Sequence, residues 1–303
     1  KSRSGQQSKR GCECPVLVMS GSKRRKLART ILIVMVSIGV PLALWGFWWE
    51  PDQLAVRRVT LALPGWPVGH EPLTVAVMSD LHAGSPYIDA AKIVRVVESV
   101  NAAGPDLVLL LGDYVIHDVV GGTRMDPAEI GKRLAGLEAP LGVYAVLGNH
   151  DWWDGAEAIR RALTQAGAVV IDNEAHRIDR PEGDFWLLGI GDAWEGRPKI
   201  DGPLAAIQDS LPVIAFTHNP DLFPAIPVEV TLTLAGHTHG GQVAIPLVGR
   251  LVVPSEFGER FAYGHIVEDN RHLYVTSGLG TTILPVRFRV PPEVVLLTIQ
   301  SAP

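Results

Sequence analysis

The sequence predicts an α/β fold in which two stacked mixed β-sheets are flanked by helices, preceded by one N-terminal transmembrane helix. Residues 30–49 form a 20-residue run without a charged side chain. Beyond this run, buried strand patterns alternate with amphipathic helix patterns, and the later part of the chain is mostly β in pattern. We therefore divide the chain into a basic tail over 1–29, a transmembrane anchor over 30–49 and one domain over 50–303.

The composition is that of a folded protein. Of the 303 residues, 47% are hydrophobic and 19% are charged, which allows a sizeable core and excludes a disordered chain. The net charge of −5 gives no reason to expect nucleic-acid binding. Cys12 and Cys14 both lie in the tail, so neither can cross-link the main domain.

The uncharged run over 30–49 has the length of a membrane helix, roughly 30 Å. Trp45, Trp48 and Trp49 gather at its far end, where indole rings favour the membrane interface. No small-residue cleavage motif follows, which favours a retained anchor over a cleaved signal. The basic residues before the run include SKRRKL, which loosely resembles a twin-arginine export signal. They predict a single-pass protein with an extracytoplasmic domain.

The remaining elements are predicted from their own patterns. Helices are expected where apolar residues recur at helical spacing: Tyr87–Asn101, Pro127–Leu137 and a helix capped by Asp154 that runs to Gln165. Strands are expected where apolar or alternating runs end in polar or turn residues. These runs are 53–66, 73–82, 106–114, 142–151, 168–172, 176–180, 184–190, 212–220, 228–241, 271–278 and 293–299.

Five of these strands end in residue types that bind metals. The endings are Asp80-Leu81-His82, Gly112-Asp113, Gly148-Asn149-His150-Asp151, Thr217-His218-Asn219 and Gly236-His237-Thr238-His239. Ligands gather outside the carboxyl ends of strands in open α/β sheets, so we expect these side chains to converge. In an extended strand, residues i and i+2 share a face, which would pair Asp80 with His82 and His237 with His239.

The donor types in these endings indicate the kind of ion. Carboxylates, imidazoles and an asparagine carbonyl, without a thiolate, suit Mn²⁺, Fe²⁺ or Zn²⁺. One carboxylate with two oxygens can bridge two ions. Glycines beside the ligands allow tight backbone turns. Each motif is weak alone, and it is the ordered set that predicts a metal centre.

The ordered set D-x-H, GD, GNHD, H and GHTH resembles that of the calcineurin-like metallophosphoesterase superfamily. The resemblance covers about Leu73 to Ile299. Within it, HNPDLF, GHTHGGQV and YVTSGLGTT with RFRVPPE resemble the membrane-associated YkuE/YaeI-like branch. The resemblance implies a metallophosphoesterase-type four-layer sandwich and a metal-dependent phosphoric ester hydrolase.

The resemblance also implies a role for each residue of the motifs. Two divalent ions would be held by seven ligands. The first ion would take Asp80, His82 and His239, the second Asn149, His218 and His237, and Asp113 would bridge them. His150 would face the phosphoryl oxygens as a catalytic residue, and Asp151 would orient His150 by a hydrogen bond.

The implied reaction is hydrolysis of a phosphomonoester, phosphodiester or pyrophosphate bond. An anchored site near a bilayer makes a lipid-linked substrate plausible, for example UDP-2,3-diacylglucosamine, which would place the enzyme in lipid A biosynthesis. Nucleotide-linked lipid precursors are usually cytoplasmic, which conflicts with an exported domain. The alternatives are a non-catalytic metal-binding membrane receptor or scaffold on the same fold, and a one-metal amidase-type hydrolase.

Other polar and aromatic residues carry weaker signals. Trp152 and Trp153 could line a substrate channel or pack in the core. His117 is expected in a solvated loop. Arg287 and Arg289 are expected as charges on a strand surface rather than as phosphate ligands.

Overall fold

The computed structural model describes residues 21–303, so the expectations for Cys12, Cys14 and the first part of the basic tail lie outside the described residues. The chain divides into two units, one that ends at Ala43 and one over Leu44–Pro303.

The described part of the first unit is helical. Helix α1 (Gly21–Leu44) leads into a π-helical turn, η1 (Trp45–Trp49), which belongs to the second unit. The stretch Ser22–Trp49 is long and apolar enough to cross a membrane. Its large apolar side chains are exposed, from Leu27 to Leu44, as a helix that faces lipid requires. The predicted anchor over 30–49 lies within this stretch, which begins earlier than the uncharged run.

The second unit contains the two predicted mixed sheets, and each has six strands. The first has the order β1-β14-β2-β3-β4-β5 and the second β12-β13-β9-β8-β7-β6, with a small hairpin, β10-β11, outside both. The strands are β1 Ala55–Leu63, β2 Leu73–Met78, β3 Leu107–Leu110, β4 Val143–Ala145, β5 Val169–Val170, β6 Glu174–Ile178, β7 Phe185–Ile190, β8 Val213–Thr217, β9 Leu232–Ala235, β10 Ala244–Ile245, β11 Gly249–Arg250, β12 Gly264–Glu268, β13 Arg271–Val275 and β14 Glu293–Ser301.

The strands at the centre of each sheet are parallel. β2, β3 and β4 pair in parallel in the first sheet, and β7, β8, β9 and β13 do so in the second. Strands β3, β8 and β9 are buried along their whole length, which explains why they are continuous apolar runs rather than alternating ones. Their carboxyl ends are the positions where the metal-binding residue types follow.

The helices are α2 Ala90–Ala103, α3 Pro127–Leu134, α4 Asn149–Gln165 and α5 Asp201–Ala205, with 3-10 turns η2 Pro220–Ala225, η3 His239–Gly241 and η4 Gly258–Phe261. Asp89 caps α2 by accepting a hydrogen bond from the Lys92 amide. Helix α4 begins at Asn149, not after Asp154 as predicted, because Gly148 takes the N-cap position. The α4 backbone is kinked at Gly155.

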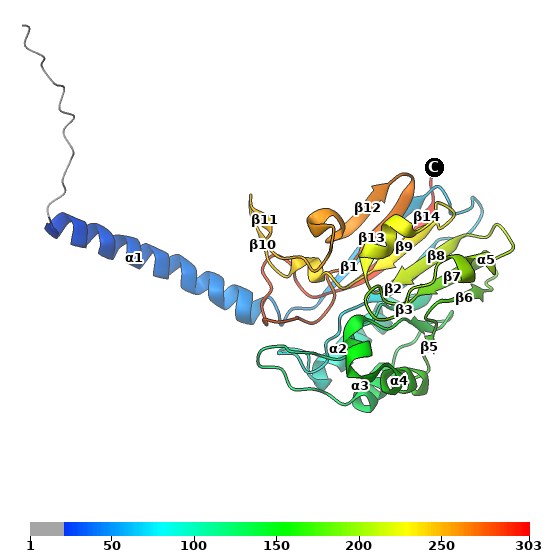
Figure 1. The fold of residues 1–303 in the computed structure, drawn as a ribbon, viewed down its shortest axis with the longest axis horizontal. Coiled ribbons are helices and arrows are strands. Elements are labelled where there is room, and N and C mark those ends of the chain that lie inside the picture. The colour runs from blue at the N-terminus through cyan, green and yellow to red at the C-terminus, as the bar shows by residue number, and fades with distance from the viewer. Residues whose placement is uncertain (1–20) are drawn as a thin grey trace, which may run out of the picture. The chain divides into compact units, whose positions relative to one another are not determined.

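Three apolar clusters lie between and beside the sheets. One fills the space between the sheets, with Phe185, Phe216 and Trp66 among its members. A second lies between the first sheet and helices α2, α3 and α4, which are gathered on one side of it (Figure 1). The third covers the outer face of the second sheet and includes Phe223 and Phe261 from η2 and η4. The layers therefore match the expected four-layer sandwich.

The segment that opens the second unit is fixed to the domain. The Arg287 amide donates to the Gly46 carbonyl at 2.9 Å, and the Tyr87 hydroxyl donates to the Phe47 carbonyl at 2.6 Å. Glu50 is buried and its carboxylate accepts a hydrogen bond from the Val290 amide at 2.6 Å. The η1 turn is thus part of the folded domain rather than a free linker.

Candidate metal centre

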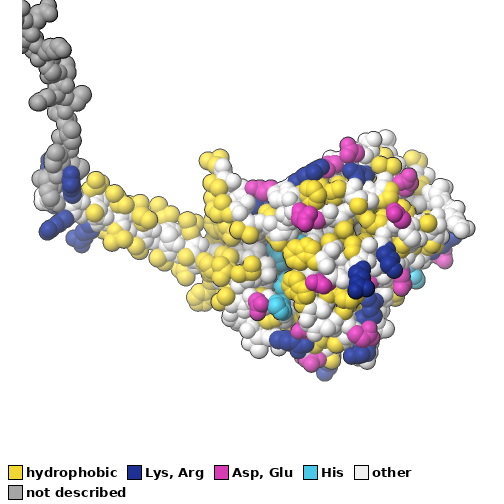
Figure 2. Space-filling model, viewed as in Figure 1, with side chains coloured by type: hydrophobic (Ala, Val, Ile, Leu, Met, Phe, Trp, Pro, Cys, Tyr) yellow, Lys and Arg dark blue, Asp and Glu magenta, His cyan; other side chains and the backbone are white. Residues whose placement is uncertain are grey.

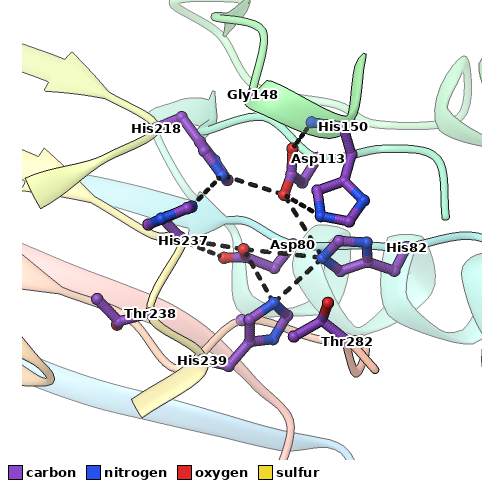
Figure 3. A network of polar contacts seen from close by, with 12 residues as sticks. Asp80, His82, Asp113, Gly148, His150, His218, His237, Thr238, His239 and Thr282 are labelled. Atoms are coloured by element: carbon purple, nitrogen blue, oxygen red, sulfur yellow. Dashed lines mark hydrogen bonds and ion pairs between the residues drawn. The ribbon is translucent and has the colours of Figure 1, made fainter. Parts of the chain in front are cut away.

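The polar endings of five strands converge between the two sheets. Asp80 and His82 follow β2, Asp113 follows β3 and Asn149 follows β4, all in the first sheet. From the second sheet, His218 follows β8, and His237 and His239 follow β9. Figure 3 shows the aspartate and histidine side chains of this group pointing toward one another.

Asp80, His82 and His239 form a first cluster. The His239 Nε2 atom lies 3.4 Å from Asp80 Oδ1 and 3.1 Å from His82 Nε2. His82 Nε2 lies 4.0 Å from Asp80 Oδ1. The three side chains are almost completely buried, and their ligand atoms are close enough together to hold one ion.

Asp113, His218 and His237 form a second cluster. His218 Nε2 lies 3.1 Å from Asp113 Oδ2 and 3.1 Å from His237 Nδ1. This cluster too has the arrangement of a possible ion site. The two histidines of the GHTH motif therefore belong to different clusters.

Asp113 joins the two clusters. Its Oδ2 atom is 3.1 Å from His218 Nε2 and 3.6 Å from His82 Nε2, so one oxygen faces both groups. His150 Nε2 lies 3.9 Å from the same oxygen. The other carboxylate oxygen, Oδ1, accepts a hydrogen bond from the His150 amide, which fixes the carboxylate plane.

The backbone at this centre is not extended, which corrects the strand-based pairing. Left-handed φ angles occur at Asp80, His82, Asp113, His237 and His239, between 43° and 68°. Residues other than glycine rarely adopt this conformation, and it is concentrated at functional sites where surrounding structure enforces it. Asp80 and His82 do share a cluster, but as members of a tight turn.

Two glycines allow the strand ends to approach so closely. A Cβ atom at Gly148 would lie 2.2 Å from Asp113 Oδ1, and one at Gly236 would lie 1.9 Å from Ser79 Oγ. Both contacts are too short for any side chain. The glycines of the GNH and GHTH motifs are therefore required because the ligand-bearing loops pack directly against them.

Hydrogen bonds to backbone carbonyls orient two of the imidazoles. His82 Nδ1 lies 3.2 Å from the Val115 carbonyl, and His218 Nδ1 lies 2.8 Å from the Leu111 carbonyl. Since a carbonyl only accepts, each Nδ1 carries a proton, and Nε2 is the nitrogen that faces the cluster. Such outer hydrogen bonds are typical of metal-binding histidines.

The protonation states also fit a cation. Burial lowers the pKa of His82 and of His237 to about 3, so both are neutral at pH 7, as a ligand must be. Burial disfavours a charged Asp113, but the neighbouring His218 and His150 hold its pKa well below the usual value. Burial also opposes a charged His218, yet Asp113 raises its pKa to about 10. A proton thus lies between Asp113 and His218, and a bound cation would replace it.

An unpartnered polar atom gives an independent test of the fit. The side-chain oxygen Oδ1 of Asn149 is buried and has no hydrogen-bond partner among residues 21–303. Buried polar groups are normally paired, and each exception calls for an unseen partner. The donor set, its geometry and this orphaned oxygen agree with a centre built for divalent cations.

Comparison with known proteins agrees with this geometry, because residues 73–241 match the calcineurin-like phosphoesterase family. The chain belongs to that family. It is 33% identical over 282 residues to Phosphodiesterase YaeI of Escherichia coli, covering 91% of this chain and 98% of the relative. It is 29% identical over 255 residues to the uncharacterized metallophosphoesterase YkuE of Bacillus subtilis, covering 83% and 87%. A transmembrane protein with a metallophosphoesterase domain from Danio rerio is 27% identical over 94% of this chain and 65% of its own length.

The predicted family and enzyme class are therefore confirmed. The chain is a metal-dependent phosphoester hydrolase of the YkuE/YaeI-like branch. Its apolar N-terminal helix and its similarity to transmembrane relatives indicate a membrane protein. Its clustered aspartates and histidines are able to bind metal ions.

The Asp151 carboxylate of the phosphoesterase was expected to hydrogen-bond to the His150 ring, but it does not. Its carboxylate accepts hydrogen bonds from the amides of Asp113 at 2.8 Å, Tyr114 at 2.8 Å and Gly148 at 2.9 Å. His150 Nδ1 has no hydrogen-bond partner in the described part of the chain. Asp151 therefore holds the backbone of the GD and GNH loops together and positions Asp113, a role that the sequence alone did not reveal.

Aromatic side chains line the open side of the phosphoesterase site. The Trp153 ring lies 5.0 Å from the His150 ring and 5.5 Å from the His117 ring, centroid to centroid. Trp194 lies 4.7 Å from His237 and 6.2 Å from Trp153. Trp153 thus lines the site, whereas Trp152 packs against the apolar core. No motif surrounds Trp194, so its sequence context provided no reason to expect it at the site.

Arg287 of the phosphoesterase is completely buried, contrary to the expectation of a surface charge. Its guanidinium donates to the carbonyls of Ser277, Gly278, Gly280 and Val290. The loop that it ties together lies against the first cluster, since the Gly280 amide donates to the Asp80 carbonyl. Arg287 therefore supports the site from behind and does not meet substrate.

Proposed function

We propose that this protein is a membrane-anchored phosphodiesterase that uses two divalent ions. The observation that carries the proposal is the position of Asp113 Oδ2, which faces imidazole nitrogens of both clusters, at 3.1 Å and 3.6 Å. A carboxylate in this position suits a bridge between two ions. The name of the YaeI relative supports diesters as the substrate class. Phosphomonoesters and pyrophosphates are the other bonds that such a centre could cleave.

The proposed ligands follow the two clusters. Asp80, His82 and His239 would hold the first ion, and His218, His237 and the Asn149 carbonyl the second, with Asp113 shared. Mn²⁺, Fe²⁺ and Zn²⁺ all suit these donors. When bound, a pair of such ions supplies Lewis-acid chemistry that neutralises phosphoryl charge and makes hydroxide available near neutral pH.

His150 is the proposed catalytic residue of the chain itself. Its ring is nearly buried, and it lies beside the shared carboxylate and under the aromatic rim. Its Nε2 atom, 3.9 Å from Asp113 Oδ2, is close enough to the clusters to meet a phosphoryl oxygen. There, His150 would donate a hydrogen bond to the phosphate and pass a proton to the leaving oxygen. Asp151 would act through the backbone by holding Asp113 in place.

The test compares two substitutions in the purified full chain with added Mn²⁺. Hydrolysis of bis-p-nitrophenyl phosphate and of p-nitrophenyl phosphate is measured beside the metal content per chain. Asp113→Ala should lose metal and activity together, because both clusters lose their shared ligand. His150→Ala should retain two ions per chain and lose about 10²–10⁴-fold in rate. Asp179→Ala, at an exposed carboxylate, is the control.

The outcomes separate the proposal from its alternatives. Full turnover by Asp113→Ala would refute the ligand assignment. Two bound ions without turnover of either ester would favour a metal-binding receptor or scaffold instead. A single ion per chain in the active wild-type protein would favour a one-metal hydrolase.

We also propose that the stretch Ser22–Trp49 anchors the enzyme with its domain on the extracytoplasmic side. The support is the apolar, lipid-compatible surface of this helix and the basic residues at its start. Protease added to intact cells should then digest the domain. A domain that stays intact until the membrane is permeabilised would reverse the proposed orientation.

Finally, we propose that the substrate is lipid-linked. An enzyme held at a bilayer meets lipids at high local concentration, and a lipid that bears a phosphodiester or pyrophosphate would suit the centre. UDP-2,3-diacylglucosamine is one such compound, and lipid A biosynthesis would be its setting. Release of its lipid monophosphate by the purified enzyme tests that compound, and turnover of other phospholipids alone would exclude it.

A further inference from the structure

An apolar cavity opens beside the first cluster. It has a volume of about 330 Å³ and reaches the metal centre at Thr238 and His239. Its walls come from two segments far apart in the chain, the residues around hairpin β10–β11 and the loop over 282–286. The wall residues are Val243, Leu251, Val252, Ile283, Leu284 and Val286. This volume lies at the lower end of the range for ligand pockets.

The mouth of the cavity is apolar and exposed. Val252 is 71% exposed, and Leu251 and Ile283 are each 64% exposed. At the tip of the hairpin, Leu247 is completely exposed, and Val248 lies beside it. Soluble surfaces rarely gather so many large apolar side chains, and such patches mark interaction sites. Figure 2 shows hydrophobic side chains gathered on this side of the domain, next to exposed histidines.

The same surface adjoins the end of the membrane-directed segment. The Arg287 amide donates to the Gly46 carbonyl, and a Cβ atom at Gly46 would lie 3.5 Å from the Val286 side chain. Gly46 belongs to η1, whose Trp48 is 68% exposed. The loop that forms one wall of the cavity thus packs against a turn that ends the candidate membrane span.

The charge of these segments also suits a membrane. Residues 241–254 contain one charged residue, Arg250, and residues 278–286 contain none. Neither segment carries an acidic side chain that would be repelled by lipid phosphates. Apolar side chains with tryptophans beside them are the composition of a surface that lies at the interface of a bilayer.

We propose that the cavity binds one hydrocarbon chain of a phosphate-bearing membrane lipid, with its mouth at the bilayer surface. This inference rests on the proposed phosphoesterase function and names where its lipid substrate is held. His239 lines the cavity and is almost completely buried, whereas the residues at the mouth are exposed, so a lipid whose chain fills the cavity presents its phosphate to the two clusters. The chain then extends back to the bilayer between Leu251 and Leu284.

The test uses a series of soluble diesters in place of a lipid. Methyl, butyl and octyl p-nitrophenyl phosphate are given to the full chain, reconstituted in phosphatidylcholine vesicles with Mn²⁺. The measured quantity is kcat/KM for each ester relative to the methyl ester of the same enzyme. Since each buried methylene strengthens binding, this ratio should rise about fourfold per added methylene until the chain fills the cavity.

Two double variants assign this rise to the cavity. Leu251→Ser with Leu284→Ser removes apolar walls at the mouth and should lower the octyl-to-methyl ratio at least tenfold. Val228→Ser with Val267→Ser removes exposed valines elsewhere and should keep the wild-type ratio. Partitioning of the octyl ester into the vesicles is common to all variants, so it cannot produce a difference between them.

Each outcome has a distinct meaning. A wild-type ratio near one overturns the hydrocarbon site, as does an equal ratio in the wild type and the Leu251/Leu284 variant. In both cases hydrolysis of the methyl ester keeps the proposed function intact. Absence of hydrolysis of every ester by the wild type refutes the proposed function, and the inference falls with it. If the Leu251/Leu284 double variant does not fold, the single variants Leu251→Ser and Leu284→Ser are compared with the wild type in its place, and an equal ratio in all three overturns the hydrocarbon site.

Discussion

Replacement of Arg287 tests whether a buried cation holds the back of the metal centre in place. Arg287→Met removes a guanidinium that donates to four carbonyls, those of Ser277, Gly278, Gly280 and Val290. Methionine fills part of the space but donates no hydrogen bond. Each carbonyl left without a partner costs about 1 kcal/mol or more, so the loss of unfolding free energy should be about 4 kcal/mol.

The loss is measurable by thermal unfolding of the full chain. For a domain of this size, 1 kcal/mol corresponds to about 2–4 °C in Tm, so Arg287→Met should lower Tm by about 8–16 °C. Activity should also fall, because the loop tied by Arg287 supports the Asp80 backbone, with the Gly280 amide 2.6 Å from the Asp80 carbonyl.

Arg289→Met provides the matched control. Arg289 is exposed and two residues away, so its replacement should change the unfolding free energy by less than about 0.5 kcal/mol. A Tm for Arg287→Met that equals that of Arg289→Met would refute the reasoning. It would mean that water or a rearranged loop satisfies the four carbonyls without the guanidinium.

Three further predictions concern the site. Gly148→Ala places a Cβ atom 2.2 Å from Asp113 Oδ1 and should abolish metal binding, measured as ions per chain, whereas Gly202→Ala, with open space around it, should bind normally. Asp151→Asn replaces one acceptor of backbone amides and should weaken Mn²⁺ binding about 10–100-fold in a titration, a result that an unaltered affinity would contradict. Trp194→Ala removes a ring 4.7 Å from the His237 ring and should raise KM several-fold at unchanged metal content; a change in metal content instead would assign the ring a structural role.

The apolar runs and the chemistry of their endings predicted most of the architecture. Strands β3, β8 and β9 are buried on both faces, so their composition alone identifies them. The ligand types follow at the strand ends because parallel strands deliver their carboxyl ends to one edge. The seven expected ligands therefore lie on segments that follow these strands and meet between the sheets, although their roles at the metals remain a proposal.

Other features depend on tertiary contacts that no local pattern records. The left-handed turns at Asp80 and His82 are imposed by neighbouring loops, so an extended strand was the natural but incorrect expectation. The Asp151 carboxylate was expected to hydrogen-bond to the His150 ring, but it accepts hydrogen bonds from three backbone amides instead. From the sequence, Arg287 is expected at the surface. The fold surrounds its guanidinium with backbone carbonyls from residues that a local pattern does not connect to it. The strands of hairpin β10–β11 have two residues each, which is too short to show the alternation of apolar and polar residues that identifies a strand.

The proposed metal ligands come from both sheets, which determines when in folding an ion can bind. Asp80 and His239 meet only after β2 and β9, which belong to different sheets, have packed together. The centre therefore does not exist in a nascent or unfolded chain, and cation loading follows assembly of the sandwich. An enzyme that crosses a membrane already folded would carry ions from the cytosol, whereas one that folds after crossing would take whichever cations prevail outside. The export route would then help to determine which metal ions the enzyme binds.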